Sequence, residues 1–146
     1  MQIEIKIDAS YTEPKIVIFA DKMTDEISEV IKKISEDSPI MITAFHENMV
    51  ELLEPDQITR IYTSSGRVYV QTLDKTYTVR QRLYELENIL SQSMFVRISN
   101  SEIINLKSVK SFDLNFSGTI CVTLVNDIVT YVSRRYVSKI KKILGI

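Results

Sequence analysis

The chain has 146 residues, of which 45% are hydrophobic and 25% are charged, so it is long and apolar enough to bury a core and is not a disordered tail. Its formal net charge of −1 argues against a uniformly basic nucleic-acid binder, and neither terminus carries the run of about 20 apolar residues that a membrane span needs. The start MQIEIKID lacks the regions of a signal peptide, so we expect a cytoplasmic protein.

The first 39 residues predict a small β-β-α unit. Residues 2–7 alternate polar and apolar side chains, and residues 15–20 form a β-branched apolar run, so each segment predicts a strand. An amphipathic helix is predicted from Thr24 to about Ser35 by a stripe at i, i+3, i+4 and i+7: Ile27, Val30, Ile31 and Ile34. Residues 36–39 are the best candidate boundary. We therefore divide the chain into an extension, 1–39, and a larger domain, 40–146.

The larger domain shows strand signals at short spacing. They fall at 40–44, 49–53, 58–63, 67–73 and 76–80, and, after a helix predicted over 83–90, at 94–98, 107–114, 119–125 and 128–132. Asn126 and Asp127 favour a two-residue hairpin. A short terminal helix follows, with an apolar stripe at Val137, Ile140, Ile143 and Leu144. Such meanders predict an α+β fold with mostly antiparallel β-sheets.

The total charge hides an asymmetry between the two parts of the chain. Residues 1–50 carry 5 Lys and Arg against 10 Asp and Glu, whereas residues 51–146 carry 13 against 9. The final stretch is basic with no acidic residue: Arg134, Arg135, Lys139, Lys141 and Lys142. Such a run is commonly a solvated helix face, but a basic cluster beside an acidic companion also fits phosphate binding.

The start of the terminal helix carries two cations in an unfavourable position. If Ser133 is its N-cap, Arg134 and Arg135 occupy the first turn, where the helix dipole already places positive charge. One interpretation is a solvated pair. The other is an anion supplied by a partner, because helix N-terminal amides and Arg side chains suit phosphate, and Arg also reads guanine bidentately.

A gapped motif gives the chain a family resemblance. The motif comprises Phe95, Arg97, Ser101, Ile104, Asn105 and Leu106. Together with the segment Ser133–Tyr136 and the acidic turn 54–58, it resembles the LytTR type of DNA-binding domain, and the likeness runs from about Met41 to Ile146. The small stand-alone regulators of this family are the most similar. The resemblance implies an elongated β-rich domain that lies along DNA and reads bases from loops rather than with a recognition helix.

The resemblance implies three base-reading positions. Local alignment places them at Arg67, in the turn 64–67, at Asn100 and at Arg135. Asn pairs bidentately with adenine, and Arg with guanine. Without the family, Arg67 is an ordinary solvated hairpin residue and Asn100 an ordinary turn residue. Many relatives have His and a basic residue where this chain has Ser99 and Asn100, so this loop carries less charge here.

Further residues are candidate phosphate ligands, because hydroxyl groups and cations position DNA without reading its sequence. They are Ser65, Ser99, Ser101, Ser133, Arg134, Lys139 and Lys142, with Arg97 as a secondary candidate. Arg97 matches a family arginine, but it lies between Val96 and Ile98 in a predicted strand. There it is equally a structural partner for a backbone or carboxylate group.

The sequence gives little support for a catalytic or metal-binding site. The only histidine, His46, has no His or Cys nearby in the sequence, and the only cysteine, Cys121, lies in an apolar strand. Three glycines and the absence of the phosphate-loop and nucleophile-elbow motifs argue against an enzyme. We expect no metal and no cofactor.

These observations favour a stand-alone LytTR-type transcriptional regulator that binds double-stranded DNA. An extension of about 40 residues is too short for a phosphoacceptor receiver, so we expect control by protein contacts rather than by phosphorylation. The resemblance leaves open a membrane-protein inhibitor and a homodimer as further partners. A protein-interaction module without DNA binding is the alternative, and a small hydrolase or ligand-binding domain is a distant third.

Overall fold

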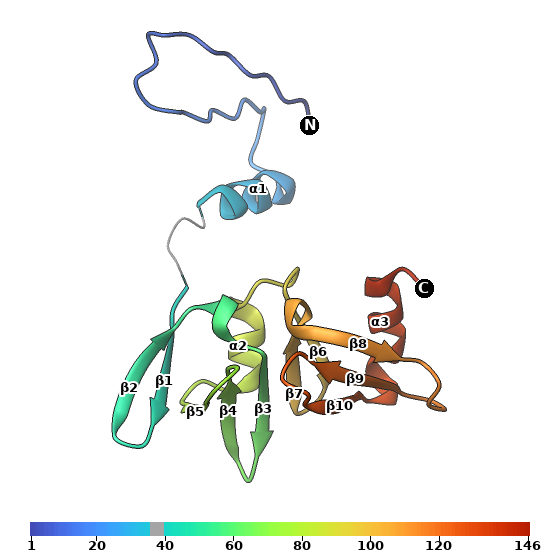
Figure 1. Ribbon diagram of the computed structural model, residues 1–146. Helices are drawn as coiled ribbons and strands as arrows, with labels where there is room; N and C mark the ends of the chain where they lie inside the picture. The colour runs from blue at the N-terminus through green and yellow to red at the C-terminus, as the bar shows by residue number, and fades with distance from the viewer. Residues whose placement is uncertain (36–39) are drawn as a thin grey trace. The chain divides into compact units, whose positions relative to one another are not determined.

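The computed structural model describes residues 1–35 and 40–146 of the chain, which divides into two compact units, Met1–Ser38 and Pro39–Ile146 (Figure 1). The predicted boundary at 36–39 lies outside the described residues.

The first unit contains one helix and no strand among its described residues. Helix α1, Asp25–Ser35, confirms the predicted helix, and the Thr24 hydroxyl accepts a hydrogen bond from the Ile27 amide at 3.3 Å. The predicted strands at 2–7 and 15–20 do not form. Alternating polar and apolar side chains make a segment suitable for a sheet, but a strand forms only when its backbone groups are hydrogen-bonded to a second strand.

The second unit is built on a seven-stranded antiparallel sheet in the order β2-β1-β5-β4-β3-β7-β6. The strands are Ile42–His46 (β1), Met49–Leu53 (β2), Arg60–Ser64 (β3), Arg67–Gln71 (β4), Thr76–Val79 (β5), Phe95–Ser99 (β6) and Glu102–Asn105 (β7). Two short 3-10 helices, Pro55–Gln57 (η1) and Leu106–Ser108 (η2), join them to their neighbours.

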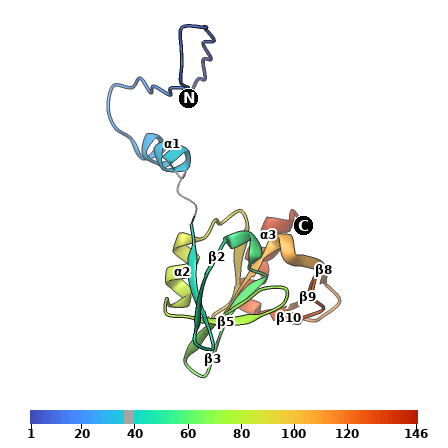
Figure 2. The same ribbon diagram turned by 60° about the vertical axis from the view of Figure 1, so that its left-hand side comes forward.

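A second, three-stranded sheet, in the order β10-β9-β8, completes this unit (Figures 1 and 2). Its strands are Val109–Asp113 (β8), Ile120–Leu124 (β9) and Val129–Val132 (β10). Helices α2, Leu83–Ile89, and α3, Arg134–Leu144, pack in two separate cores. The α+β fold with mostly antiparallel sheets is thereby confirmed.

Strands β6 and β7 lie between the two cores. Phe95 and Ile103 belong to the core under α2, whereas Val96 and Ile104 belong to the core with the three-stranded sheet and α3. Both faces of these strands are buried, which explains the nearly continuous apolar run in this part of the sequence. The turn that joins them is therefore carried by strands fixed on both sides.

The strands and helices predicted between residues 40 and 146 all form, with ends shifted by a few residues. Strand β7 was not predicted. The last hairpin also differs, because the Leu124 amide bonds to the Ile128 carbonyl at 2.8 Å and Asp127 has φ +62°, so its loop has three residues rather than two.

Buried polar groups connect the two sheets. The Glu102 carboxylate on β7 accepts a hydrogen bond from the Thr130 hydroxyl on β10 at 2.7 Å and pairs with Arg60 on β3 at 3.3 Å. The Arg60 guanidinium also donates to Gln71 on β4 at 2.6 Å. A buried carboxylate is tolerated because its oxygens have these partners.

Asn105 of the sequence motif has a structural role. Its side-chain amide donates to the Ile58 carbonyl at 2.9 Å, and its Oδ1 accepts from the Lys107 amide at 2.9 Å, where it caps η2. Because Asn105 is 1% exposed, both backbone groups depend on it rather than on water.

A hydrogen bond at the far edge of the large sheet shifts two pKa values. The buried Tyr77 hydroxyl donates to Glu51 at 2.6 Å. That hydrogen bond, together with burial, raises the pKa of Tyr77 to about 12, and it lowers the pKa of Glu51, with a smaller contribution from Lys75. We expect one of the seven tyrosines to titrate well above pH 10 when tyrosinate absorbance is followed against pH.

The sign of the linked stability follows from the raised pKa. An unfolded tyrosine ionises near pH 10, so this contact stabilises the fold fully below pH 10, and its contribution is lost as pH rises towards about 12. Tyr77→Phe should abolish the late titration and return the pKa of Glu51 towards its ordinary value. Tyr84→Phe, at an exposed tyrosine, is the matched control, and a late titration that survives Tyr77→Phe contradicts the assignment.

Candidate nucleic-acid interface

The hairpin between β3 and β4 presents the first predicted base-reading residue. Ser65 and Gly66 have φ of +52° and +75°, as a two-residue turn of type I′ requires. Arg67 follows at the first position of β4, opposite Ser64 in register, and its side chain is exposed. Among the described residues it has no ion-pair partner, so its guanidinium is available to a ligand.

The turn between β6 and β7 presents the second predicted base-reading residue, Asn100. Asn100 and Ser101 form its tip, and both are exposed. The Ser99 hydroxyl lies 3.2 Å from the Ser101 hydroxyl and accepts a hydrogen bond from the Ser101 amide at 3.2 Å. These contacts shape the turn that carries Asn100.

Arg97 fixes the backbone of this turn from within β6. Its guanidinium donates to the carbonyls of Ser99 at 2.7 Å and Asn100 at 2.6 Å, and it forms an ion pair with Glu87 of α2. The side chain is only 14% exposed. The structure thus favours the structural role for Arg97, which orients the turn that carries Asn100.

The start of α3 presents the third predicted base-reading residue, Arg135. Ser133 is the N-cap residue by position, and Arg134 and Arg135 occupy the first turn, as the sequence predicted. The Ser133 hydroxyl makes no capping hydrogen bond. Arg134 lies against Gly118 of the β8–β9 loop, where an added Cβ would stand 3.0 Å from its Nε atom. Gly118 therefore leaves room for the Arg134 side chain, and both Arg134 and Arg135 are exposed.

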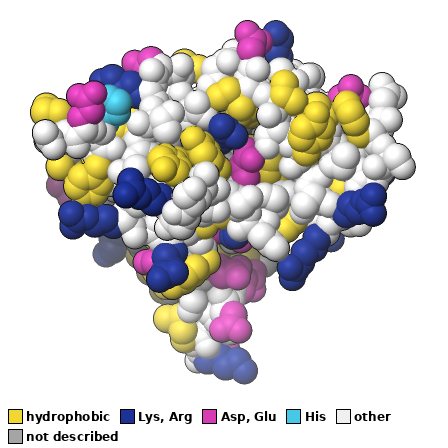
Figure 3. All heavy atoms as spheres, turned by 90° about the horizontal axis from the view of Figure 1, so that it is seen from below, with side chains coloured by type: hydrophobic (Ala, Val, Ile, Leu, Met, Phe, Trp, Pro, Cys, Tyr) yellow, Lys and Arg dark blue, Asp and Glu magenta, His cyan; other side chains and the backbone are white. Residues whose placement is uncertain are grey.

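Hydrogen bonds bring these three loops to one edge of the second unit. The Thr63 amide at the end of β3 donates to the Ser101 carbonyl at 2.9 Å, and the Ser133 amide donates to the Ile98 carbonyl of β6 at 2.9 Å. The Tyr136 hydroxyl, one turn into α3, donates to Oδ1 of Asn100 at 3.1 Å. Figure 3 views this edge from below and shows Lys and Arg side chains at several places across it.

Helix α3 extends the basic surface along its exposed side. Arg135, Lys139 and Lys142 are spaced i, i+4 and i+7, which places them on one face, and all three are exposed. Ile140 on the opposite face is buried in the second core. The helix therefore offers phosphate groups a stripe of cations that begins at the predicted base-reading arginine.

Some residues at this edge were missed from the sequence. An open hollow of about 780 Å³ lies between the β3–β4 hairpin and the start of α2, and Arg80 and Arg82 line it together with Arg67. The segment 80–82, Arg-Gln-Arg, at the end of a predicted strand was the available signal. Tyr136, which orients Asn100, gave no signal because 36 residues separate the two.

Other kinds of site find little support in residues 1–35 and 40–146. No group of three or more His, Cys, Asp or Glu side chains in these ranges is placed to hold a metal ion. His46 instead lies beside the Thr76 carbonyl, with Nδ1 at 3.2 Å, and packs edge-on against Tyr77. None of the described helices has the length and apolar character to cross a membrane.

The chain is similar to known regulators over its whole length. The model of the LytTr DNA-binding domain matches residues 48–145. An HTH-type transcriptional regulator of Staphylococcus aureus (strain NCTC 8325 / PS 47) is 31% identical over 100% of this chain and 99% of its own. A regulator of the same description from strain MRSA252 is 30% identical with the same coverage.

A solved structure shares the fold. The LytTr DNA-binding domain of a putative methyl-accepting/DNA response regulator from Bacillus cereus superimposes with a TM-score of 0.70 at 23% identity, over 73% of this chain and 97% of that domain. Within residues 40–146, α2 and α3 are separated by five strands, so they form no helix-turn-helix. The family match and the fold agree with the sequence motif, and the chain belongs to the LytTR family of DNA-binding domains.

Proposed function

We propose that this protein is a sequence-specific DNA-binding transcriptional regulator that reads base edges with Arg67, Asn100 and Arg135. The observation that carries the proposal is the convergence of three loops on one edge, each with an exposed polar side chain on a hydrogen-bonded backbone. A rigid edge with separate protruding loops suits a partner that offers successive grooves, as duplex DNA does.

The geometry of Asn100 supports adenine as its target. Bidentate pairing requires the side-chain nitrogen to donate to N7 and the oxygen to accept from N6. Tyr136 donates to Oδ1, which fixes the orientation of the amide, and the oxygen keeps a second lone pair for a base. The side-chain nitrogen makes no hydrogen bond to another described residue, so it is free to donate.

Phosphate groups would be held around these positions. Ser65 in the hairpin, Ser133 and Arg134 at the start of α3, and Lys139 and Lys142 along it offer hydroxyl groups and cations. Ser99 and Ser101 contact each other, so their hydroxyls contribute more to the shape of the turn than to phosphate binding. Such contacts fix the position of the domain on DNA without specifying sequence.

Control would act through protein contacts rather than phosphorylation, in a cytoplasmic, non-enzymatic protein. Residues 1–39 carry the acidic excess and lie outside the matched segment, 48–145. We therefore assign them to self-association or to contact with a regulatory protein, for which a membrane-protein inhibitor is one candidate. Residues 40–146 would hold the DNA-binding function.

Substitution of two base-reading residues tests the proposal. Asn100→Ala and Arg135→Ala should each weaken binding to the specific site by about 1–3 kcal/mol, because each removes a bidentate contact to one base. Binding to random DNA should change much less. The measurement is a titration of both DNAs, together with selection of preferred sites from a random pool.

Lys142→Ala is the matched control, because it removes a charge from the same surface without removing a base contact. It should weaken specific and random binding alike. If Asn100→Ala leaves both affinity and base preference unchanged, Asn100 does not read a base and the assignment of this turn is wrong.

A further inference from the structure

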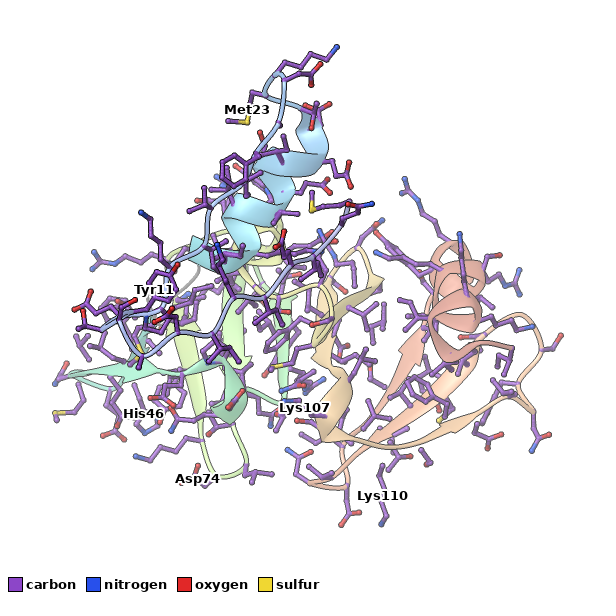
Figure 4. The ribbon with its side chains drawn as sticks, turned by 90° about the horizontal axis from the view of Figure 1, so that it is seen from above. Tyr11, Met23, His46, Asp74, Lys107 and Lys110 are labelled. Atoms are coloured by element: carbon purple, nitrogen blue, oxygen red, sulfur yellow. The ribbon has the colours of Figure 1, made fainter. Side chains whose placement is uncertain are left out.

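The first segment of the chain exposes apolar side chains that a folded protein normally buries. Ile3, Ile5 and Ile7 are 88%, 80% and 93% exposed. Figure 4, which labels Tyr11 and Met23 in this unit, draws no strand between residues 1 and 24. The Tyr11 amide bonds to the Asp8 carbonyl at 3.1 Å, so a turn ends the segment. Residues 2–8 are thus a strand-like segment without a strand partner among the described residues.

The alternation separates this segment into two faces. In an extended conformation Ile3, Ile5 and Ile7 share one face, while Gln2, Glu4, Lys6 and Asp8 share the other. A partner strand must place apolar side chains opposite the isoleucines and must match the charges on the second face. The sequence of the segment itself meets both demands.

Antiparallel pairing with an identical segment, centred on Ile5, puts Ile3 opposite Ile7 and Glu4 opposite Lys6 of the second copy. By symmetry Lys6 also faces Glu4, so two oppositely charged pairs form. A register shifted by two residues places like charges opposite each other, either Glu4 opposite Glu4 or Lys6 opposite Lys6. An in-register parallel pair makes both of these unfavourable contacts. A shift by one residue turns the isoleucines to the charged face. Charge complementarity therefore selects a single register.

We infer that residues 2–8 pair antiparallel with the same segment of a second copy of this chain, about a two-fold axis that passes through Ile5. The segment 15–20 is a poorer partner, because its one charged residue, Lys15, cannot neutralise Lys6. A self-complementary segment gives an isologous, closed dimer.

Other exposed apolar side chains of the first unit could cover the apolar face of the paired strands. A two-stranded ribbon alone is marginal in water. Helix α1 offers an apolar stripe that includes Ile31 and Ile34, which are 40% and 44% exposed, and residues 16–19 expose further apolar side chains. Two copies would bring two such sets of exposed apolar side chains together, so that each could cover the other.

The inference rests on the proposed assignment of residues 1–39 to protein contacts, and it names the partner. A two-fold dimer would carry two DNA-binding domains, so the operator would contain two half-sites. The dimer itself needs no DNA.

Charge reversal in the full chain tests the register, with the dimer dissociation constant measured by analytical ultracentrifugation at low salt and without DNA. Glu4→Lys and Lys6→Glu should each raise that constant about ten- to thirtyfold, since each turns two attractive pairs into two repulsive ones. The double variant Glu4→Lys/Lys6→Glu should restore it. An equimolar mixture of the two single variants should form heterodimers, because all charges are again matched.

Lys15→Glu, a charge reversal in the same unit outside the segment, is the matched control and should leave the dissociation constant unchanged. A monomeric wild-type chain overturns the inference, and so does a double variant as weak as the single ones or single variants that dimerise like the wild type. Site selection from random DNA reports separately on the proposed function, since Glu4 and Lys6 lie outside the base-reading edge.

Discussion

Raising the salt concentration from about 50 to 200 mM is expected to weaken binding of this chain to its own promoter by about 40-fold. Each phosphate neutralised by a cation releases counterions, with a slope near −0.9 per contact on a double logarithmic plot. Besides the proposed base readers, the interface offers exposed cations at three places: Arg134, Lys139 and Lys142. Three phosphate contacts give a slope of about −2.7, and a fourfold change in salt then gives this loss.

Single charge deletions calibrate this result. Lys142→Ala should reduce the slope by about 1, because it removes one phosphate contact. Lys107→Ala should leave it unchanged, because Lys107 lies in η2, at the opposite end of β7 from the Asn100 turn, and is labelled in the view from above in Figure 4. Equal affinity at both salt concentrations would remove the nucleic-acid function and favour a protein-interaction module.

Replacing Glu102 with alanine is expected to lower the free energy of unfolding of the second unit by about 3 kcal/mol. The variant leaves Arg60 without its carboxylate and the Thr130 hydroxyl without its acceptor, in a region where the Glu102 side chain is 11% exposed. Loss of one partner from a buried pair costs more than the pair contributes, because the remaining charge stays desolvated. Urea titration followed by circular dichroism measures the change.

Glu102→Gln is the matched control for shape. It keeps an acceptor for Thr130 but removes the charge that faces Arg60, so its destabilisation should be smaller than that of Glu102→Ala. A change below about 0.5 kcal/mol for Glu102→Ala, the range of ordinary surface substitutions, would show that this network does not hold the two sheets together.

Much of the second unit was predictable because its signals are local. Alternation and turn residues placed β2 at Met49–Leu53, as the structure has it, and a turn at 64–67, within which the structure has the β3–β4 hairpin turn at Ser65–Gly66. Strand β7 was missed because Glu102–Asn105 is short and buried on both faces, so it shows no alternation. The segments 2–7 and 15–20 failed for the opposite reason, since their pattern is strand-like but the chain's described structure supplies no ladder.

The sequence predicted the positions of the candidate base-reading residues, but it did not predict the side chains that hold them in place. The family resemblance, confirmed by the match over residues 48–145 and by the fold, supplied Arg67, Asn100 and Arg135. Their base-reading roles stay predictions. The contacts of Arg97 with Glu87 and of Tyr136 with Asn100 join different elements, and no spacing in the sequence specifies such pairs. These side-chain pairs can be identified only from the tertiary structure.

The burial of β6 and β7 on both faces has a consequence for the entropy of binding. A loop that must be ordered by its target loses conformational freedom when it binds, and that loss reduces affinity. The Asn100 turn is already ordered, because it continues two strands held by separate cores and its carbonyls are fixed by Arg97. Under the proposed function, recognition at this turn would resemble the docking of a rigid probe. Exchange of the side chain at its tip should then change the preferred base without a matching change in the ordering cost.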